Sequence, residues 1–118
     1  MNLVYLWYMD LMTLNSSQKA LHVNLNDDIY GSFAEIGAGQ ETVRHFFRAG
    51  GASGTIAKAM SAYDKAFSNA IYGDEPKDRY VTEPRLRKML NHEYGLLEVR
   101  LVREQDSTKQ YFAFANTV

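Results

Sequence analysis

The segment from residue 32 to residue 48 constrains the fold of this chain more than any other. Residues 32–36 form a short, mostly apolar run that is typical of a buried strand, and a Gly-Ala-Gly turn at 37–39 follows directly. Residues 40–48 then carry apolar side chains at helical spacing. A strand, a glycine turn and a helix in this order predict an α/β unit, in which helices pack on a sheet.

Two further helices are expected downstream. Residues 56–71 carry apolar side chains every three or four positions, which predicts a helix that Ser53 or Thr55 caps and Gly73 ends. A later helix should begin after Thr82 and present one apolar stripe. That stripe consists of Leu86, Leu90, Tyr94, Leu97 and Leu101.

The last part of the chain completes the expected sheet. Residues 111–115 are almost entirely apolar, which predicts a strand covered on both faces. The connection between this strand and residues 32–36 is long, so we expect the two strands to pair in parallel. Gly95 lies inside a predicted helix, where it indicates a bend or the close approach of another element.

These elements describe a helix-rich α/β fold with three main helices and a short sheet of two strands. A chain of 118 residues has room for one hydrophobic core, and we assign that domain to residues 17–118. Residues 1–16 are interpreted as an N-terminal extension. The apolar final strand indicates that the sheet is an incomplete part of a larger one, in the N-terminal part of a longer protein.

Composition excludes several classes of function. The net charge of −1 gives no basic field for nucleic acid or an anionic membrane surface, so neither partner is expected. The chain has no cysteine, which removes thiolate metal sites and disulfide frameworks, and its histidines have no metal-ligand spacing. No complete catalytic motif is present, so whether the chain is an enzyme stays open. A cytoplasmic location is expected.

Glycine turns supply the candidate ligand-binding residues. Glycine lets a ligand approach the backbone closely, and free N–H groups at a helix start favour an anion. The lysine that a P-loop requires is absent, and a flexible joint between helices is the alternative interpretation. The candidates are Glu35, Gly37, Gly39, Gly51, Ser53, Gly54, Thr55 and Lys58.

Residues 34–39, Ala-Glu-Ile-Gly-Ala-Gly, look like the first motif of Rossmann-type methyltransferases, where a glycine turn admits S-adenosylmethionine. That family next needs a second strand that ends in an acidic residue. Here Gly50 and Gly51 are expected to lead into another helix instead.

Arg85, Arg87 and Lys88 crowd the start of the last predicted helix. Pairing of Glu83 with Arg87, and of the cluster with the acidic loop at 74–78, explains them most simply, while an anionic partner is the alternative.

Longer motifs carry a second resemblance, over about residues 19–118. They include Phe-Ala-Glu-Ile-Gly-Ala-Gly-Gln-Glu at 33–41, Gly-Gly-Ala-Ser-Gly-Thr-Ile-Ala-Lys at 50–58 and the final Phe-Ala-Phe-Ala-Asn-Thr-Val at 112–118. By these the chain resembles a poorly characterised bacterial family whose members bear names such as TonB-dependent receptor or nicotinate-nucleotide adenylyltransferase. The chain has too few strands for a receptor barrel and no histidine-x-glycine-histidine turn for the transferase. The resemblance implies that similar proteins continue past Val118.

Three hypotheses of function follow. The first is a ligand-binding or regulatory domain for an anionic or nucleotide-like molecule at the candidate residues. The second is a structural or assembly domain that associates with a second copy or with a downstream domain. The third is a fragment of an S-adenosylmethionine-dependent methyltransferase.

Overall fold

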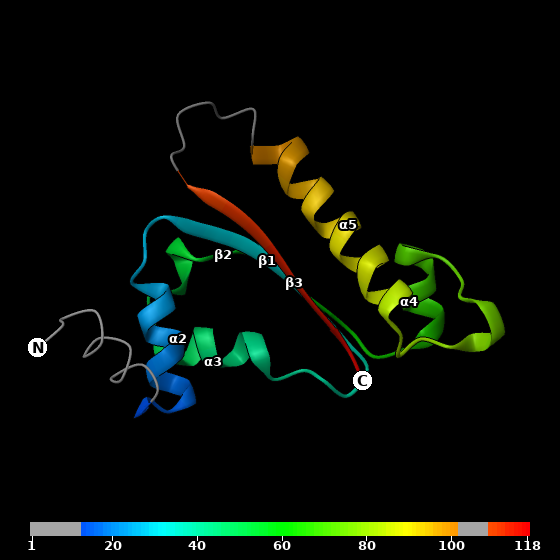
Figure 1. Ribbon diagram of the computed structural model, residues 1–118, viewed down its shortest axis with the longest axis horizontal. Helices are drawn as coiled ribbons and strands as arrows, with labels where there is room; N and C mark the ends of the chain where they lie inside the picture. Colours follow the sequence, from blue (N-terminus) through cyan, green and yellow to red (C-terminus); the bar gives the residue numbers. More distant parts are fainter. Residues whose placement is uncertain (1–12, 102–108) are drawn as a thin grey trace, which may run out of the picture.

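A three-stranded parallel sheet with helices on both faces forms the centre of the protein (Figure 1). The computed structural model describes residues 13–101 and 109–118. The strand order is β2-β1-β3. The strands are β1 (Ile29–Ile36), β2 (Ile56–Ala62) and β3 (Gln110–Thr117).

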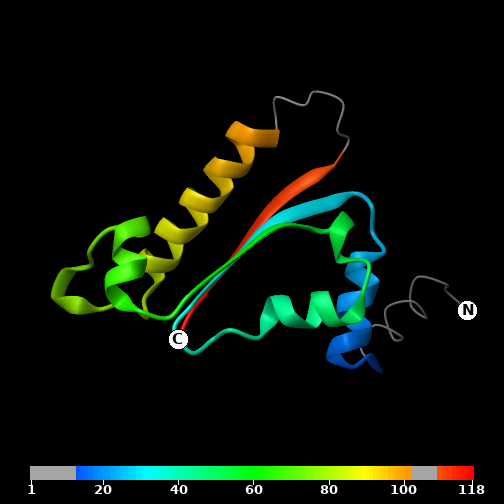
Figure 2. The ribbon, with the colours of Figure 1, turned by 180° about the vertical axis from the view of Figure 1, so that it is seen from behind.

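The helices are divided between the two faces of the sheet. Figures 1 and 2 show α2 (Ser16–Asn24) and α3 (Thr42–Ala49) on one side, and α4 (Lys65–Tyr72) and α5 (Glu83–Leu101) on the other. The short 3-10 helix η1 (Ala52–Gly54) precedes β2. A second one, η2 (Pro76–Asp78), lies between α4 and α5.

The central strand β1 holds the two layers together because its side chains alternate between the faces. Phe33 is 2% exposed and stacks on Phe46 of α3 and on two rings of β3. Ala34, fully buried, points the other way and packs in a cluster with Met89 of α5 and Tyr72 of α4. Each face therefore has its own apolar core, and β1 contributes to both.

The strand pairing predicted for the end of the chain is confirmed. β3 runs parallel to β1, with Ser32 opposite Ala113 and Ile36 opposite Thr117. The prediction that this strand is covered on both faces is wrong, because the apolar residues of β3 are only half-buried at the edge of the sheet.

The helix predicted over residues 56–71 is wrong in its first half. Residues 56–62 form β2, which pairs in parallel with β1, and α4 begins only at Lys65. A spacing of four, as between Ile56 and Met60, also keeps two side chains on one face of a strand, so the pattern is compatible with both structures. The stop at Gly73 is confirmed, since α4 ends at Tyr72.

The last helix, α5, has the predicted bounds but a different buried face. Its buried residues are Arg85, Met89, Glu93 and Leu97. Of the predicted apolar stripe only Leu97 is buried, while Tyr94 is 37% exposed. Polar partners on α4 and β2 explain how two charged side chains come to be buried, as described below.

At the other end of the chain, Asn15 caps α2 in a reciprocal capping box with Gln18. Most of the proposed N-terminal extension, residues 1–12, lies outside the described residues.

Candidate functional site

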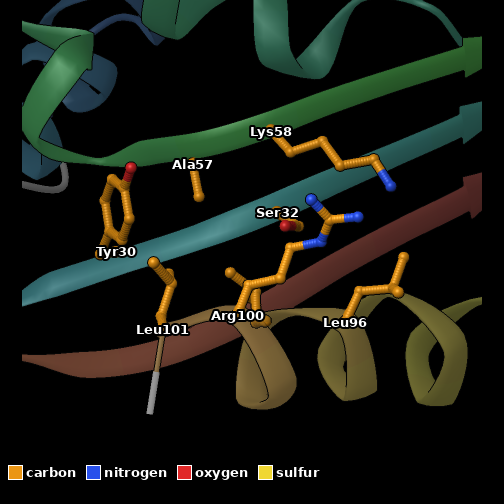
Figure 3. A pocket seen from close by; sticks show the side chains of 8 residues that line it. Tyr30, Ser32, Ala57, Lys58, Leu96, Arg100 and Leu101 are labelled. Atoms are coloured by element: carbon orange, nitrogen blue, oxygen red, sulfur yellow. The ribbon is translucent and has the colours of Figure 1, made fainter. Parts of the chain in front are cut away.

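A pocket of about 420 Å³ lies between the sheet and the second half of α5 (Figure 3). On the side of the sheet, the first halves of β1 and β2 form its wall, close to the edge where these strands begin. The volume is within the range of pockets that hold small molecules. The lining residues are Tyr30, Ser32, Ala57, Lys58, Leu96, Leu97, Arg100 and Leu101.

Two polar groups in this pocket have no partner within residues 13–101 and 109–118. The Arg100 guanidinium makes no hydrogen bond or ion pair there, and the Ser32 hydroxyl makes none either. Ser32 is 2% exposed, so its hydroxyl has little access to solvent other than the pocket. Figure 3 shows the guanidinium of Arg100 extending toward Ser32 and Lys58. The arrangement offers three donors to one ligand.

The ammonium of Lys58 is held by a buried carboxylate. Lys58 Nζ lies 2.7 Å from Glu93 Oε2, and Glu93 is 1% exposed. The Tyr72 hydroxyl donates to the other oxygen, Oε1, at 2.8 Å. Burial first, and then the hydrogen bond to Glu93, raises the pKa of the Tyr72 hydroxyl above its ordinary value. Lys58 and Glu93 cancel in charge, so Arg100 leaves the pocket with one net positive charge.

Of the eight candidate residues proposed from the sequence, Lys58 is the one that lines this pocket. The two glycine turns lie at opposite edges of the sheet: Gly37 follows the end of β1, whereas η1 with Ser53 and Gly54 precedes the start of β2. A strand of seven residues, about 20 Å long, separates these edges. The turns therefore do not form one site, and the helix start predicted near Thr55 is the start of a strand.

At the edge where β1 ends, the first two backbone donors of the turn are already used. Gly37 N–H donates to Ala62 O and Ala38 N–H donates to Val118 O. Glu35, 1% exposed, accepts the N–H of Thr42 at the start of α3. This carboxylate takes the place at the helix N-terminus that an external anion would need.

The side chain of Gln40 forms hydrogen bonds across this turn. Its amide Nε2 donates to the carbonyls of Glu35 and Gly37 at 2.8 and 2.9 Å, and its Oε1 accepts from Ser61. Asn116 of β3 donates to Glu35 Oε1 at 2.9 Å. Glu35, Gly37 and Gly39 are thus brought together. The polar contacts around them stabilise the turn and are not directed at a ligand.

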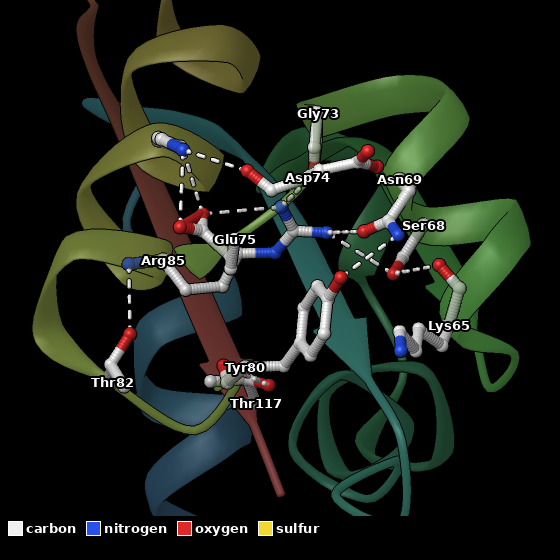
Figure 4. A network of polar contacts seen from close by, with 11 residues as sticks. Lys65, Ser68, Asn69, Gly73, Asp74, Glu75, Tyr80, Thr82, Arg85 and Thr117 are labelled. Carbon is white, nitrogen blue, oxygen red and sulfur yellow. Dashed lines mark hydrogen bonds and ion pairs between the residues drawn. The ribbon is translucent and has the colours of Figure 1, made fainter. Parts of the chain in front are cut away.

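The basic cluster at the start of α5 makes internal ion pairs, as the simpler of the two interpretations predicts (Figure 4). Arg85, with no exposed surface, donates to Gly73 O at 2.6 Å and approaches Glu75 at 3.3 Å. Lys88 contacts the same carboxylate at 2.9 Å, and this hydrogen bond is the main cause that lowers the pKa of Glu75. Arg87 pairs with Glu83 on the surface.

Sequence reasoning missed most of the pocket. Lys58 is the one pocket residue among the candidates, and the position of Arg100 beside Ser32 depends on the packing of α5 across the sheet. Within the described ranges, no group of three metal-ligating side chains occurs and no helix is long and apolar enough to cross a membrane.

Comparison with protein-family models, with curated proteins and with solved structures found no significant match to this chain.

Proposed function

We propose that this protein is a ligand-binding domain whose pocket between β1, β2 and α5 takes a small anion with an apolar part. The observation that carries the proposal is the unpartnered Arg100 guanidinium, which faces the unpartnered Ser32 hydroxyl in a pocket walled by leucines. Arg100 is exposed, so water solvates its guanidinium in the free protein, and a bound anion would replace that water with charge-assisted hydrogen bonds.

The lining defines the class of ligand. A guanidinium presents paired donors that match a carboxylate or phosphate, and Lys58 and Ser32 add donors beside it. Leu96, Leu97 and Leu101 offer apolar contact for the remainder of the molecule. An organic phosphate or carboxylate satisfies both halves of the pocket, whereas inorganic phosphate satisfies only the polar half.

Thermal denaturation in the presence of millimolar ligands tests this proposal. The set should contain inorganic phosphate, benzoate, octanoate and adenosine monophosphate, with uncharged benzyl alcohol as the comparison. We expect an organic anion to raise the melting temperature and benzyl alcohol to leave it unchanged. No shift with any anion would contradict the proposal.

The variant Arg100→Gln identifies the site. Losing a charged hydrogen bond should weaken binding at least about tenfold in calorimetric titration. Arg87→Gln is the matched control, because it removes the same charge from the same helix at a surface position that is 72% exposed. Equal loss in both variants would indicate non-specific attraction of anions.

A second candidate is S-adenosylmethionine binding at the turn after β1. The objection drawn from the sequence was that a helix follows Gly50 and Gly51, but the next regular element is β2, parallel to β1. Asp64 lies just beyond the end of β2, where an acidic residue of that family would contact the ribose. The Asp64 carboxylate caps α4 through Phe67 N–H at 2.8 Å, and the N–H groups of Gly37 and Ala38 are already bonded. Including S-adenosylmethionine in the thermal assay, with Asp64→Asn as the variant, tests this candidate.

A further inference from the structure

The outer edge of β3 has no partner strand among the residues that the structure describes. Gln110 N–H donates to Asp28 O and Val118 N–H donates to Ile36 O, so even-numbered residues of β3 bond toward β1. Because main-chain groups alternate along a strand, Tyr111, Ala113, Ala115 and Thr117 direct their N–H and C=O groups away from the sheet.

The two edge strands of the sheet differ in the features that discourage pairing with another strand. Residues 110–117 contain no proline and no charged side chain, and their pairing with β1 has no irregularity. The other edge, β2, carries Lys58 and a register shift near Gly31. Edge strands usually carry a charge, a bulge or a proline that discourages pairing. β2 has two of these protections and β3 has none of the three.

A groove lies between the edge strand β3 and helix α5. It has a volume of about 430 Å³ and is lined by Leu90, Asn91, Tyr94, Gly95, Glu98 and Ala113. Apart from the backbone of α5 itself, no atom of the described residues lies within 4 Å of the position that a Cβ on Gly95 would take. The open space beside Gly95 and the half-exposed ring of Tyr94 thus lie next to the free edge of β3.

We propose that two copies of this chain associate through β3, in an antiparallel pair about a two-fold axis near Ala113. The axis would make one six-stranded sheet and would bring the two α5 helices together on the same face. Because α5 contacts both β1 and β3, the two helices would be separated by two strand spacings, or about 10 Å. This distance is the usual one between packed helices.

The composition of the edge favours a second copy as the occupant. Antiparallel pairing of residues 110–117 opposes no like charges, since the segment has no charge. In the antiparallel helix pair, Gly95 of one α5 faces Gly95 of the other, so the groove beside it receives the partner helix. Glu98 then lies toward Asn91 of the partner subunit rather than toward a second carboxylate.

Sedimentation velocity over a dilution series tests the proposal on the intact chain. From about 200 μM down to about 1 μM, we expect the mass to fall from twice 13.5 kDa toward 13.5 kDa. A monomer at every concentration would overturn the proposal, as would an assembly that grows beyond a dimer, because a two-fold pair leaves no free β3 edge.

Two variants locate the interface. Gly95→Gln adds a side chain in the groove and replaces glycine within a helix, so the monomer should be at least as stable while dimer affinity falls at least about tenfold. Ala113→Pro removes an outward N–H from β3, and Ala59→Pro on exposed β2 is its matched control. A dimer that resists Gly95→Gln, or that is weakened by Ala59→Pro and not by Ala113→Pro, would contradict the proposed interface. Because Gly95→Gln needs no change in the sheet, it decides the question even if the proline variants do not fold.

Discussion

The buried Glu93 carboxylate joins Tyr72 and Lys58: it accepts from the Tyr72 hydroxyl at 2.8 Å and pairs with the Lys58 ammonium at 2.7 Å. Three elements, α4, α5 and β2, meet at this one side chain. The contact links the core on this face of the sheet to the wall of the pocket.

The Tyr72 hydroxyl makes stability sensitive to alkali. Its pKa is raised in the folded protein, so at high pH the unfolded chain loses this proton first, and folding stability falls as pH rises above about 10. Below that pH, Tyr72→Phe should cost about 1–3 kcal/mol because Glu93 loses a donor. The difference between wild type and Tyr72→Phe should shrink above pH 10. Urea denaturation at pH 8, 10 and 11 measures it, and a constant difference would refute the assignment.

Arg85 and Arg87 lie two positions apart on α5 but should differ greatly in their effect on stability. Arg85 is fully buried among Gly73, Glu75 and Ser68, so Arg85→Ala should cost about 3–5 kcal/mol by leaving the Glu75 carboxylate short of a partner. Arg87→Ala removes an exposed pair and should cost less than about 1 kcal/mol. Equal free energies of unfolding for the two variants would show that the network in Figure 4 contributes little.

Gly37 is required by its backbone conformation and by its neighbour. Its φ is +75°, and a Cβ there would lie 2.0 Å from Val118 O. Gly37→Ala should therefore destabilise the protein by about 2 kcal/mol or more, through strain and displacement of the end of β3. Gly54→Ala is the control, since no described residue beyond its chain neighbours comes within 4 Å of that Cβ. Thermal denaturation of both variants gives the comparison, and equal melting temperatures would contradict it.

The buried hydroxyl of Thr55 should contribute nothing to the stability of the fold. The residue is fully buried and its hydroxyl has no partner among the described residues. Thr55→Val keeps the shape and removes the unsatisfied group, so stability should stay equal or rise by about 1 kcal/mol. A loss of more than about 1 kcal/mol would mean that the hydroxyl has a bonded partner in solution, such as a water molecule.

The sequence predicted the parts of the fold that depend on local signals. Helix α5 begins where Thr82 and Glu83 indicated, and α4 ends before Gly73 as predicted. The parallel pairing of β1 and β3 also followed from the sequence, because an apolar strand needs a covered neighbour. These features required no knowledge of how the layers pack.

β2 and the pocket could not be predicted in this way. The spacing of Ile56 and Met60 suits both a helix and a strand, and only main-chain pairing with β1 decides between them. The pocket depends on the angle at which α5 crosses the sheet, because that packing brings Arg100 to Ser32. Neither the strand pairing nor the crossing angle of α5 produces a periodic pattern of residues in a single sequence.

The position of β1 between its two partners also affects how the protein folds. The pairing with β2 spans about 25 residues of chain, whereas Ile29 lies opposite Gln110, a separation of 81 residues. During synthesis β1 can pair on one side long before its second neighbour exists, which leaves the Phe33 ring without the two rings of β3 that cover it. Closing the larger loop is the slower event, so completion of the sheet, rather than formation of any helix, is expected to limit the rate of folding.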